Sequence, residues 1–126
     1  VSTKLTCKRK IPLPVSGAFH SPLMQDASIK FTEELHKINF HDAIAPVLSN
    51  SDPTPTQSGI LLKQKLIKQM TTGVRWRETM DLIKDLAITN IIEIGPGNVL
   101  SGLAKRELKE ISINQVSTSI DLGYTN

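Results

Sequence analysis

The segment Ile91–Asn98 reads IIEIGPGN and indicates a buried strand that passes through a tight turn into a helix. Ile91–Ile94 is short, β-branched and almost wholly apolar, which is typical of a strand covered by helices in a parallel sheet. Gly95-Pro96-Gly97 ends the strand abruptly, and Asn98 is suited to cap the following helix. Because parallel strands need helical crossovers, this stretch predicts an α/β fold.

The turn in EIGPGN leaves two interpretations open. The free N–H groups at the start of the helix could bind an anion or a phosphate. The turn lacks, however, both the glycine fingerprint of dinucleotide sites and the lysine of a phosphate loop. A tight connection between strand and helix is therefore the favoured interpretation.

Apolar periodicity on both sides of this segment predicts the other elements. It indicates helices over about residues 22–37, 57–70 and 76–87, and a fourth from Asn98 with Leu100, Leu103 and Leu108 facing inward. Pro46–Ser49 and Ile111–Val116 are strand candidates, whereas the turn formers of Asn50–Pro55 predict a loop. We expect a small, open sheet with exposed edges.

Composition limits the class of protein. The chain has 126 residues, 39% of them hydrophobic, which suits one soluble domain or a piece of one. The net charge of +3 comes without the arginine clusters or interleaved aromatics of nucleic-acid binding. Cys7 is the single cysteine, so we expect no disulfide and no thiolate metal site. We see neither a membrane-spanning run nor a signal sequence, and because the chain begins at Val1 it could be a processed product or a fragment.

Gly17–Met24, GAFHSPLM, carries the strongest candidate for chemistry. Just before it, Pro12 and Pro14 make Ile11–Val15 extended, and Ser21-Pro22 indicates an N-cap followed by proline at the first helical position. The positive end of the helix dipole disfavours an imidazolium at His20, which leaves a neutral ring able to accept a proton. His20 is thus a candidate general base; a loop histidine bonded to the backbone is the alternative.

Other candidates are weaker. His36 and His41 are five residues apart, which does not place them on one helical face as a metal pair, so we interpret them as surface residues. No G-x-S-x-G elbow is present, so a nucleophile, if the chemistry needs one, lies elsewhere. Two lysine-rich stretches could attract phosphates or an acidic protein, or could simply form solvated faces: Lys8, Arg9 and Lys10, and Lys63, Lys65 and Lys68.

Four blocks in order and register carry a family resemblance: Leu13–Met24, Ala45–Asn50, Val74–Trp76 and Glu93–Arg106. Together they resemble the C-terminal part of the malonyl-CoA:acyl-carrier-protein transacylases, over almost the whole chain up to about Val116. The resemblance implies a hydrolase-like α/β acyltransferase domain interrupted by a small ferredoxin-like subdomain. Residues 1–15 would then end the small subdomain, residues 16–116 would form the C-terminal part of the large one, and residues 117–126 would be a polar tail.

The resemblance also implies roles for particular residues. In that family a serine of a GHSxGE elbow attacks malonyl-CoA, and His20 matches the histidine that accepts its proton. The main-chain carbonyl of Arg75, in VRW, would orient the imidazole, although Thr72-Gly73 stands where the family often has proline. Phe19 matches the substrate-binding aromatic residue that goes with malonyl rather than methylmalonyl selection. The resemblance calls for no cofactor and no metal.

We therefore expect the C-terminal portion of an enzyme of fatty-acid synthesis, which transfers malonyl from malonyl-CoA to acyl carrier protein. The serine and the malonate-binding arginine would belong to a missing N-terminal region, and this chain would be inactive alone. The expected location is the cytoplasm, or the plastid stroma in a eukaryote, without nucleic-acid or membrane partners. The alternatives are a polyketide-type acyltransferase or hydrolase of the same fold, and a non-catalytic module that binds a carrier protein through Lys63, Lys65, Lys68 and Lys105.

Overall fold

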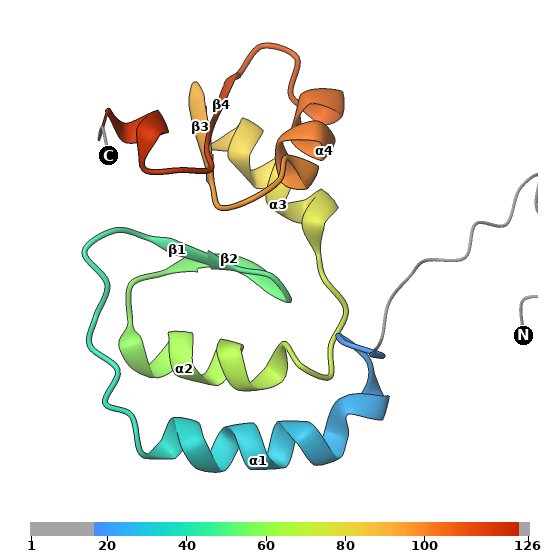
Figure 1. Cartoon of the computed structure of the whole chain (residues 1–126). Helices are drawn as coiled ribbons and strands as arrows, with labels where there is room; N and C mark the ends of the chain where they lie inside the picture. The colour runs from blue at the N-terminus through green and yellow to red at the C-terminus, as the bar shows by residue number, and fades with distance from the viewer. Residues whose placement is uncertain (1–16, 124–126) are drawn as a thin grey trace, which may run out of the picture.

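The structure, a computed structural model, describes residues 17–123, so the expectations for residues 1–15 lie outside the described part. Helices and strands are interspersed along the chain, and they alternate strictly from α3 to β4 (Figure 1). The elements are η2 (Pro22–Met24), α1 (Gln25–His36), β1 (Val47–Ser49), β2 (Asp52–Thr56), α2 (Gly59–Lys68), α3 (Trp76–Asp85), β3 (Asn90–Ile94), α4 (Val99–Glu107), β4 (Ser112–Val116) and η3 (Ile120–Leu122). None of the helices in this part of the chain is long and apolar enough to span a membrane.

The first half of the chain forms three stacked layers. Figure 1 shows α1 lying along α2, and the hairpin of β1 and β2 covering the other side of α2. Ser58 caps α2 by accepting a hydrogen bond from the N–H of Leu61, and Asp42 accepts one from the N–H of Gly59 at 2.8 Å. These caps fix the start of α2 and therefore also the position of its far end, where the candidate site lies.

The predicted loop over residues 50–55 is wrong, because Asp52–Thr56 forms strand β2. It pairs antiparallel with β1, with Val47 opposite Thr56 and Ser49 opposite Asp52. Pro53 and Pro55 lack the N–H that a central strand needs, but among the described residues β2 has a strand neighbour on one side only and tolerates them. The turn formers thus mark an edge strand rather than a loop.

The second half contains a parallel pair with helices on one face. β3 and β4 align from Asn90 opposite Ser112 to Ile94 opposite Val116, which confirms the α/β class. The core under them consists of Met80, Ala104 and Leu108, with Trp76, Ile83, Ile91, Ile111 and Ile113 packed around it. Of the three leucines predicted to face inward, only Leu108 does, because Leu100 and Leu103 are 47% and 37% exposed.

Two glycines in helices are expected to respond oppositely to alanine. At Gly59 a Cβ would lie 2.6 Å from the His41 carbonyl oxygen, so Gly59→Ala should destabilise the fold by about 1–3 kcal/mol. At Gly102, inside α4, a Cβ would meet nothing within 4 Å, so Gly102→Ala should stabilise by about 0.5–1 kcal/mol. Urea unfolding of both variants checks this, and effects of the same sign would contradict it.

Candidate active site

His20 lies in a turn that the backbone holds in an unusual conformation. Its φ of 59° is in the left-handed region, which non-glycine residues rarely adopt. The Ser21 hydroxyl donates to the carbonyl of Ala18 at 2.6 Å and closes the turn around His20. Ser21 therefore does not cap the helix through its side chain as predicted, whereas Pro22 does stand at the first helical position.

A backbone carbonyl at the end of α2 holds the imidazole. The Nδ1 atom of His20 lies 2.8 Å from the carbonyl oxygen of Gln69, the residue that directly follows α2. Because a carbonyl can only accept, Nδ1 must carry a proton, and in the neutral ring Nε2 then has the lone pair. The contact thus sets the tautomer that a general base requires.

The structure does not bring the Arg75 carbonyl to His20. That oxygen accepts from the N–H of Thr79 at 3.1 Å and from its hydroxyl at 3.0 Å, within the first turn of α3. The N–H of Arg75 donates to the carbonyl of Asn50 at 2.7 Å and ties the VRW segment to the β1–β2 turn. Gln69 takes the place that was expected for Arg75, and no local sequence pattern marks it.

Phe19 stands next to His20 and is 64% exposed. A Cβ on Gly17 would lie 2.7 Å from the nearest atom of its ring, so the ring can adopt this position only because residue 17 has no side chain. The phenyl group is therefore largely exposed, beside His20 in the chain.

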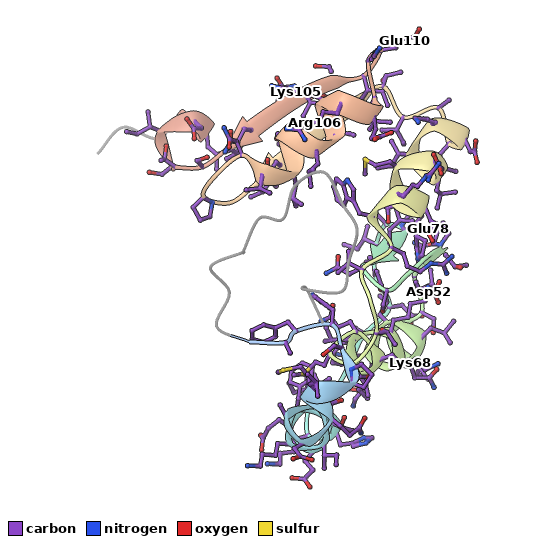
Figure 2. The ribbon with its side chains drawn as sticks, turned by 90° about the vertical axis from the view of Figure 1, so that its right-hand side faces the viewer. Asp52, Lys68, Glu78, Lys105, Arg106 and Glu110 are labelled. Atoms are coloured by element: carbon purple, nitrogen blue, oxygen red, sulfur yellow. The ribbon has the colours of Figure 1, made fainter. Side chains whose placement is uncertain are left out.

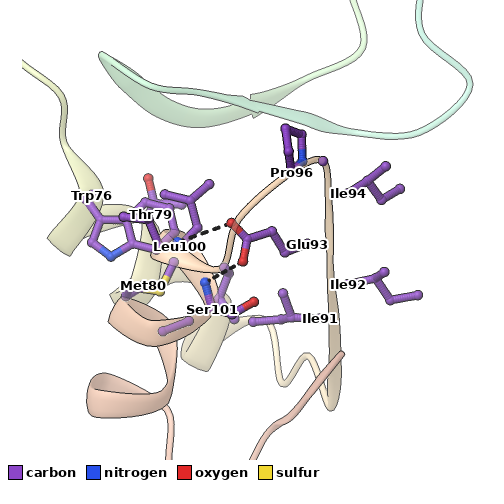
Figure 3. Close-up of a pocket in the computed structure, with 14 residues that line it drawn as sticks. Trp76, Thr79, Met80, Ile91, Ile92, Glu93, Ile94, Pro96, Leu100 and Ser101 are labelled. Carbon is purple, nitrogen blue, oxygen red and sulfur yellow. Dashed lines mark hydrogen bonds between the residues drawn. The ribbon is translucent and has the colours of Figure 1, made fainter. Parts of the chain in front are cut away.

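The turn in EIGPGN is occupied by the chain's own carboxylate. Glu93 accepts from the N–H groups of Leu100 at 3.2 Å and Ser101 at 2.8 Å, at the start of α4 (Figure 3). Asn98 makes no side-chain cap, contrary to prediction. The side chain and N–H of Ser101, with the N–H of Leu100, lower the pKa of Glu93. This supports the tight connection over an anion site.

The other candidate groups do not assemble into sites. Within residues 17–123, no three His, Cys, Asp or Glu side chains are placed to hold a metal. Lys63 donates to the Ile38 carbonyl at 2.9 Å, and Lys65 pairs with Asp52 at 3.2 Å. Figure 2 shows Lys105 on α4 in the upper part of the view and Lys68 on α2 in the lower part, well apart. The four lysines therefore do not form one patch.

Comparison with known proteins identifies the relatives of this chain, although no family profile matches it. The malonyl-CoA:acyl-carrier-protein transacylase of Synechocystis is 46% identical over 123 residues, which are 98% of this chain and 42% of that protein. The transacylase of Bacillus subtilis is 43% identical over 88% of this chain and 36% of its own length.

Solved structures agree with these relatives. The Synechocystis transacylase superposes with a TM-score of 0.86 at 47% identity, over 94% of this chain and 40% of that one. A malonyl transacylase in complex with a type II polyketide synthase acyl-carrier protein superposes with a TM-score of 0.80 at 37% identity, over 89% and 37%. In sequence and in fold the chain is therefore similar to solved α/β transacylases. More narrowly, it is homologous to part of the malonyl-CoA:acyl-carrier-protein transacylases and spans about two fifths of their length.

Ser21→Ala should loosen the turn that presents His20, because it removes the hydrogen bond to Ala18. One neutral hydrogen bond contributes about 0.5–1.5 kcal/mol to stability. Its loss from the turn should weaken the contact between Nδ1 and Gln69 and so lower the fraction of the ring that is protonated at Nδ1. Long-range ¹H–¹⁵N NMR of the imidazole measures this. Ser21→Thr keeps a hydroxyl and is the control; a Ser21→Ala ring with the original tautomer balance would contradict the role of Ser21.

Glu93→Gln should destabilise the fold in a pH-dependent way. The folded-state pKa of Glu93 is lowered from 4.5, so its contribution is present above that pH and is lost as the pH falls further. The melting temperatures of wild type and Glu93→Gln should therefore differ at about pH 6 and converge towards about pH 3. Glu107→Gln, at the other end of α4, is the control, and a gap that persists at low pH would count against the carboxylate cap.

Proposed function

We propose that this chain supplies the general base of a transacylase that moves malonyl from malonyl-CoA to the phosphopantetheine thiol of an acyl carrier protein. The observation that carries the proposal is the 2.8 Å contact between His20 Nδ1 and the Gln69 carbonyl. It leaves Nε2 as a proton acceptor at a position that the resemblance assigns to the base. The 46% identity to a transacylase supports the reaction class.

The reaction has two half-reactions in which His20 moves one proton. In the first, Nε2 takes the proton of a serine hydroxyl while the serine oxygen attacks the malonyl thioester. The C–S bond breaks, and the imidazolium returns the proton to the sulfur of CoA. In the second, Nε2 takes the proton of the carrier thiol, whose sulfur attacks the malonyl-serine ester. The C–O bond breaks and the serine regains its proton.

Gln69 and Phe19 take supporting roles in this proposal. The Gln69 carbonyl accepts from Nδ1–H throughout, so it keeps the ring oriented and stabilises the transient imidazolium without adding a charge. Phe19 forms a wall of the acyl pocket, where its ring would crowd the additional methyl of a methylmalonyl group. One methyl group changes the binding free energy in a hydrophobic pocket by about 1–3 kcal/mol, which limits the selectivity that Phe19 can provide.

The alternatives differ from this proposal in what accepts the acyl group. A polyketide-type acyltransferase would use the same first half-reaction, and a hydrolase would pass the malonyl group to water. The solved relative in complex with an acyl-carrier protein supports a carrier as the acceptor. The non-catalytic binding module has less support, because Lys63 and Lys65 are bonded within the chain and Lys105 lies far from Lys68.

A chimera tests the role of His20. The chain replaces the 123 matching residues of the Synechocystis transacylase, and malonyl transfer to holo acyl carrier protein is measured. His20→Ala should slow formation of the malonyl-enzyme by about 10²–10⁴-fold, the usual contribution of a general base. His36→Ala, on the exposed surface of α1, is the matched control and should keep the rate. A His20→Ala chimera with the parent rate would remove His20 from the mechanism, and transfer by the 126-residue chain alone would refute the need for a second part.

A further inference from the structure

Lys65 of α2 differs from the other paired cations in its burial. Its side chain is 11% exposed and pairs with Asp52. The cations of the other three ion pairs within residues 17–123 are 46–68% exposed. Exposed pairs contribute little to stability, whereas a charge that is largely removed from water needs a full set of partners. Lys65 has such a set, and all of it comes from one strand.

The ammonium group of Lys65 is directed at three oxygen atoms of β2. Its Nζ atom lies 3.2 Å from Oδ2 of Asp52, and it donates to the carbonyl of Asp52 at 3.3 Å and to the carbonyl of Thr54. An ammonium has three protons, so these contacts use all of them. The other carboxylate oxygen of Asp52 accepts from the N–H of Thr54 at 3.0 Å. The side chain and N–H of Thr54, and then Lys65, lower the pKa of Asp52, so the pair is charged at neutral pH.

Lys65 lies one helical turn before the carbonyl that holds the imidazole. The carbonyl of Lys65 accepts from the N–H of Gln69 at 3.1 Å, and the carbonyl of Gln69 is the partner of His20. The caps at Ser58 and Asp42 fix the opposite end of α2. The contact between Lys65 and β2 therefore fixes the part of the helix that the His20 contact requires.

A second contact with the same hairpin follows Gln69 in the chain. The N–H of Arg75 donates to the carbonyl of Asn50, in the turn between β1 and β2. Gln69 thus lies between two segments that are both bonded to the hairpin. Figure 1 shows this hairpin and α1 on opposite sides of α2. The hairpin consequently supports the last turn of α2 from the side that faces away from α1.

We infer that Lys65 is a positioning residue of the active site: it fixes the last turn of α2 against β2 and thereby keeps the Gln69 carbonyl within hydrogen-bond distance of His20. Lys65 acts through the backbone of Gln69 and moves no proton of the reaction. The inference rests on the proposed function, because it concerns the residue that the proposal makes the general base. The competing role for Lys65 is direct binding of an acidic carrier protein.

The two half-reactions of the chimera described above separate these roles. Formation of the malonyl-enzyme from malonyl-CoA takes place before any carrier protein binds. Lys65→Met removes the charge and the donors but keeps an unbranched side chain. It should lower the rate constant of this step at saturating malonyl-CoA by about 10–100-fold, because small displacements of a catalytic group are costly. A loss confined to transfer to the carrier protein would assign Lys65 to carrier binding and overturn the inference.

Lys68→Met is the matched control. It removes the same charge from an exposed side chain that directly precedes Gln69, and no ion pair within residues 17–123 includes Lys68. A cation near the end of a helix is favourable through the helix dipole alone, and the control removes that effect without touching β2. Lys68→Met should keep the rate of malonyl-enzyme formation. Equal losses in the two variants would overturn the inference.

The tautomer of His20 gives a readout that does not depend on catalysis. Long-range ¹H–¹⁵N NMR of the histidine-labelled chimera should show a lower fraction protonated at Nδ1 in Lys65→Met and no change in Lys68→Met. Asp52→Asn breaks the ion pair but spares both carbonyl contacts, so it should give a smaller change in the same direction and extends the test if Lys65→Met fails to fold. An unchanged tautomer in the folded variants would overturn the inference.

The same spectra separate this inference from the proposed function. An altered tautomer in Lys65→Met with both transfer steps at the parent rate would refute proton transfer by His20. It would leave the positioning of the Gln69 carbonyl by Lys65 supported.

Discussion

The hydrogen bond between His20 and the Gln69 carbonyl joins residues that are 49 positions apart. It can form only because the first half of the chain holds both residues in place. It needs the left-handed turn at His20, which the Ser21 hydroxyl closes. It also needs the last turn of α2 at a fixed place, which the caps at Ser58 and Asp42 secure. A shift of α2 along α1 by one residue, about 1.5 Å, would remove the contact.

The chain buries little of its apolar surface within residues 17–123. In that part the buried hydrophobic side chains are Leu35, Met80, Ala104 and Leu108, whereas Leu23, Ile44 and Ile94 are more than four-fifths exposed. Burial contributes about 25 cal/mol per Å² of apolar surface, so these faces represent stabilisation that the chain does not realise within its described part. None of these three exposed residues lies within an α-helix, so helical periodicity did not predict them.

The sequence predicted those elements that local patterns determine. The helices and the strand at Ile91–Ile94 follow from periodicity and β-branching, and the structure confirms them within a few residues. The sequence analysis missed β2, because prolines argue against a strand unless that strand is known to lie at the edge of a sheet. It also missed Gln69 and the capping role of Glu93, because both depend on which segments meet in space. The assignment of Arg75 followed the VRW motif, whereas the carbonyl that contacts His20 belongs to Gln69, which lies outside that motif.

A carbonyl suits the proposed chemistry better than the carboxylate of a conventional triad. The imidazole must both accept a proton from an attacking hydroxyl or thiol and return it to a leaving sulfur or oxygen, so neither protonation state should be strongly favoured. A carboxylate beside the ring would favour the imidazolium through its charge. It would also stand near a malonyl group that is itself negative. The Gln69 carbonyl fixes the tautomer while adding only a dipole, and it therefore orients the base without biasing it against either half-reaction.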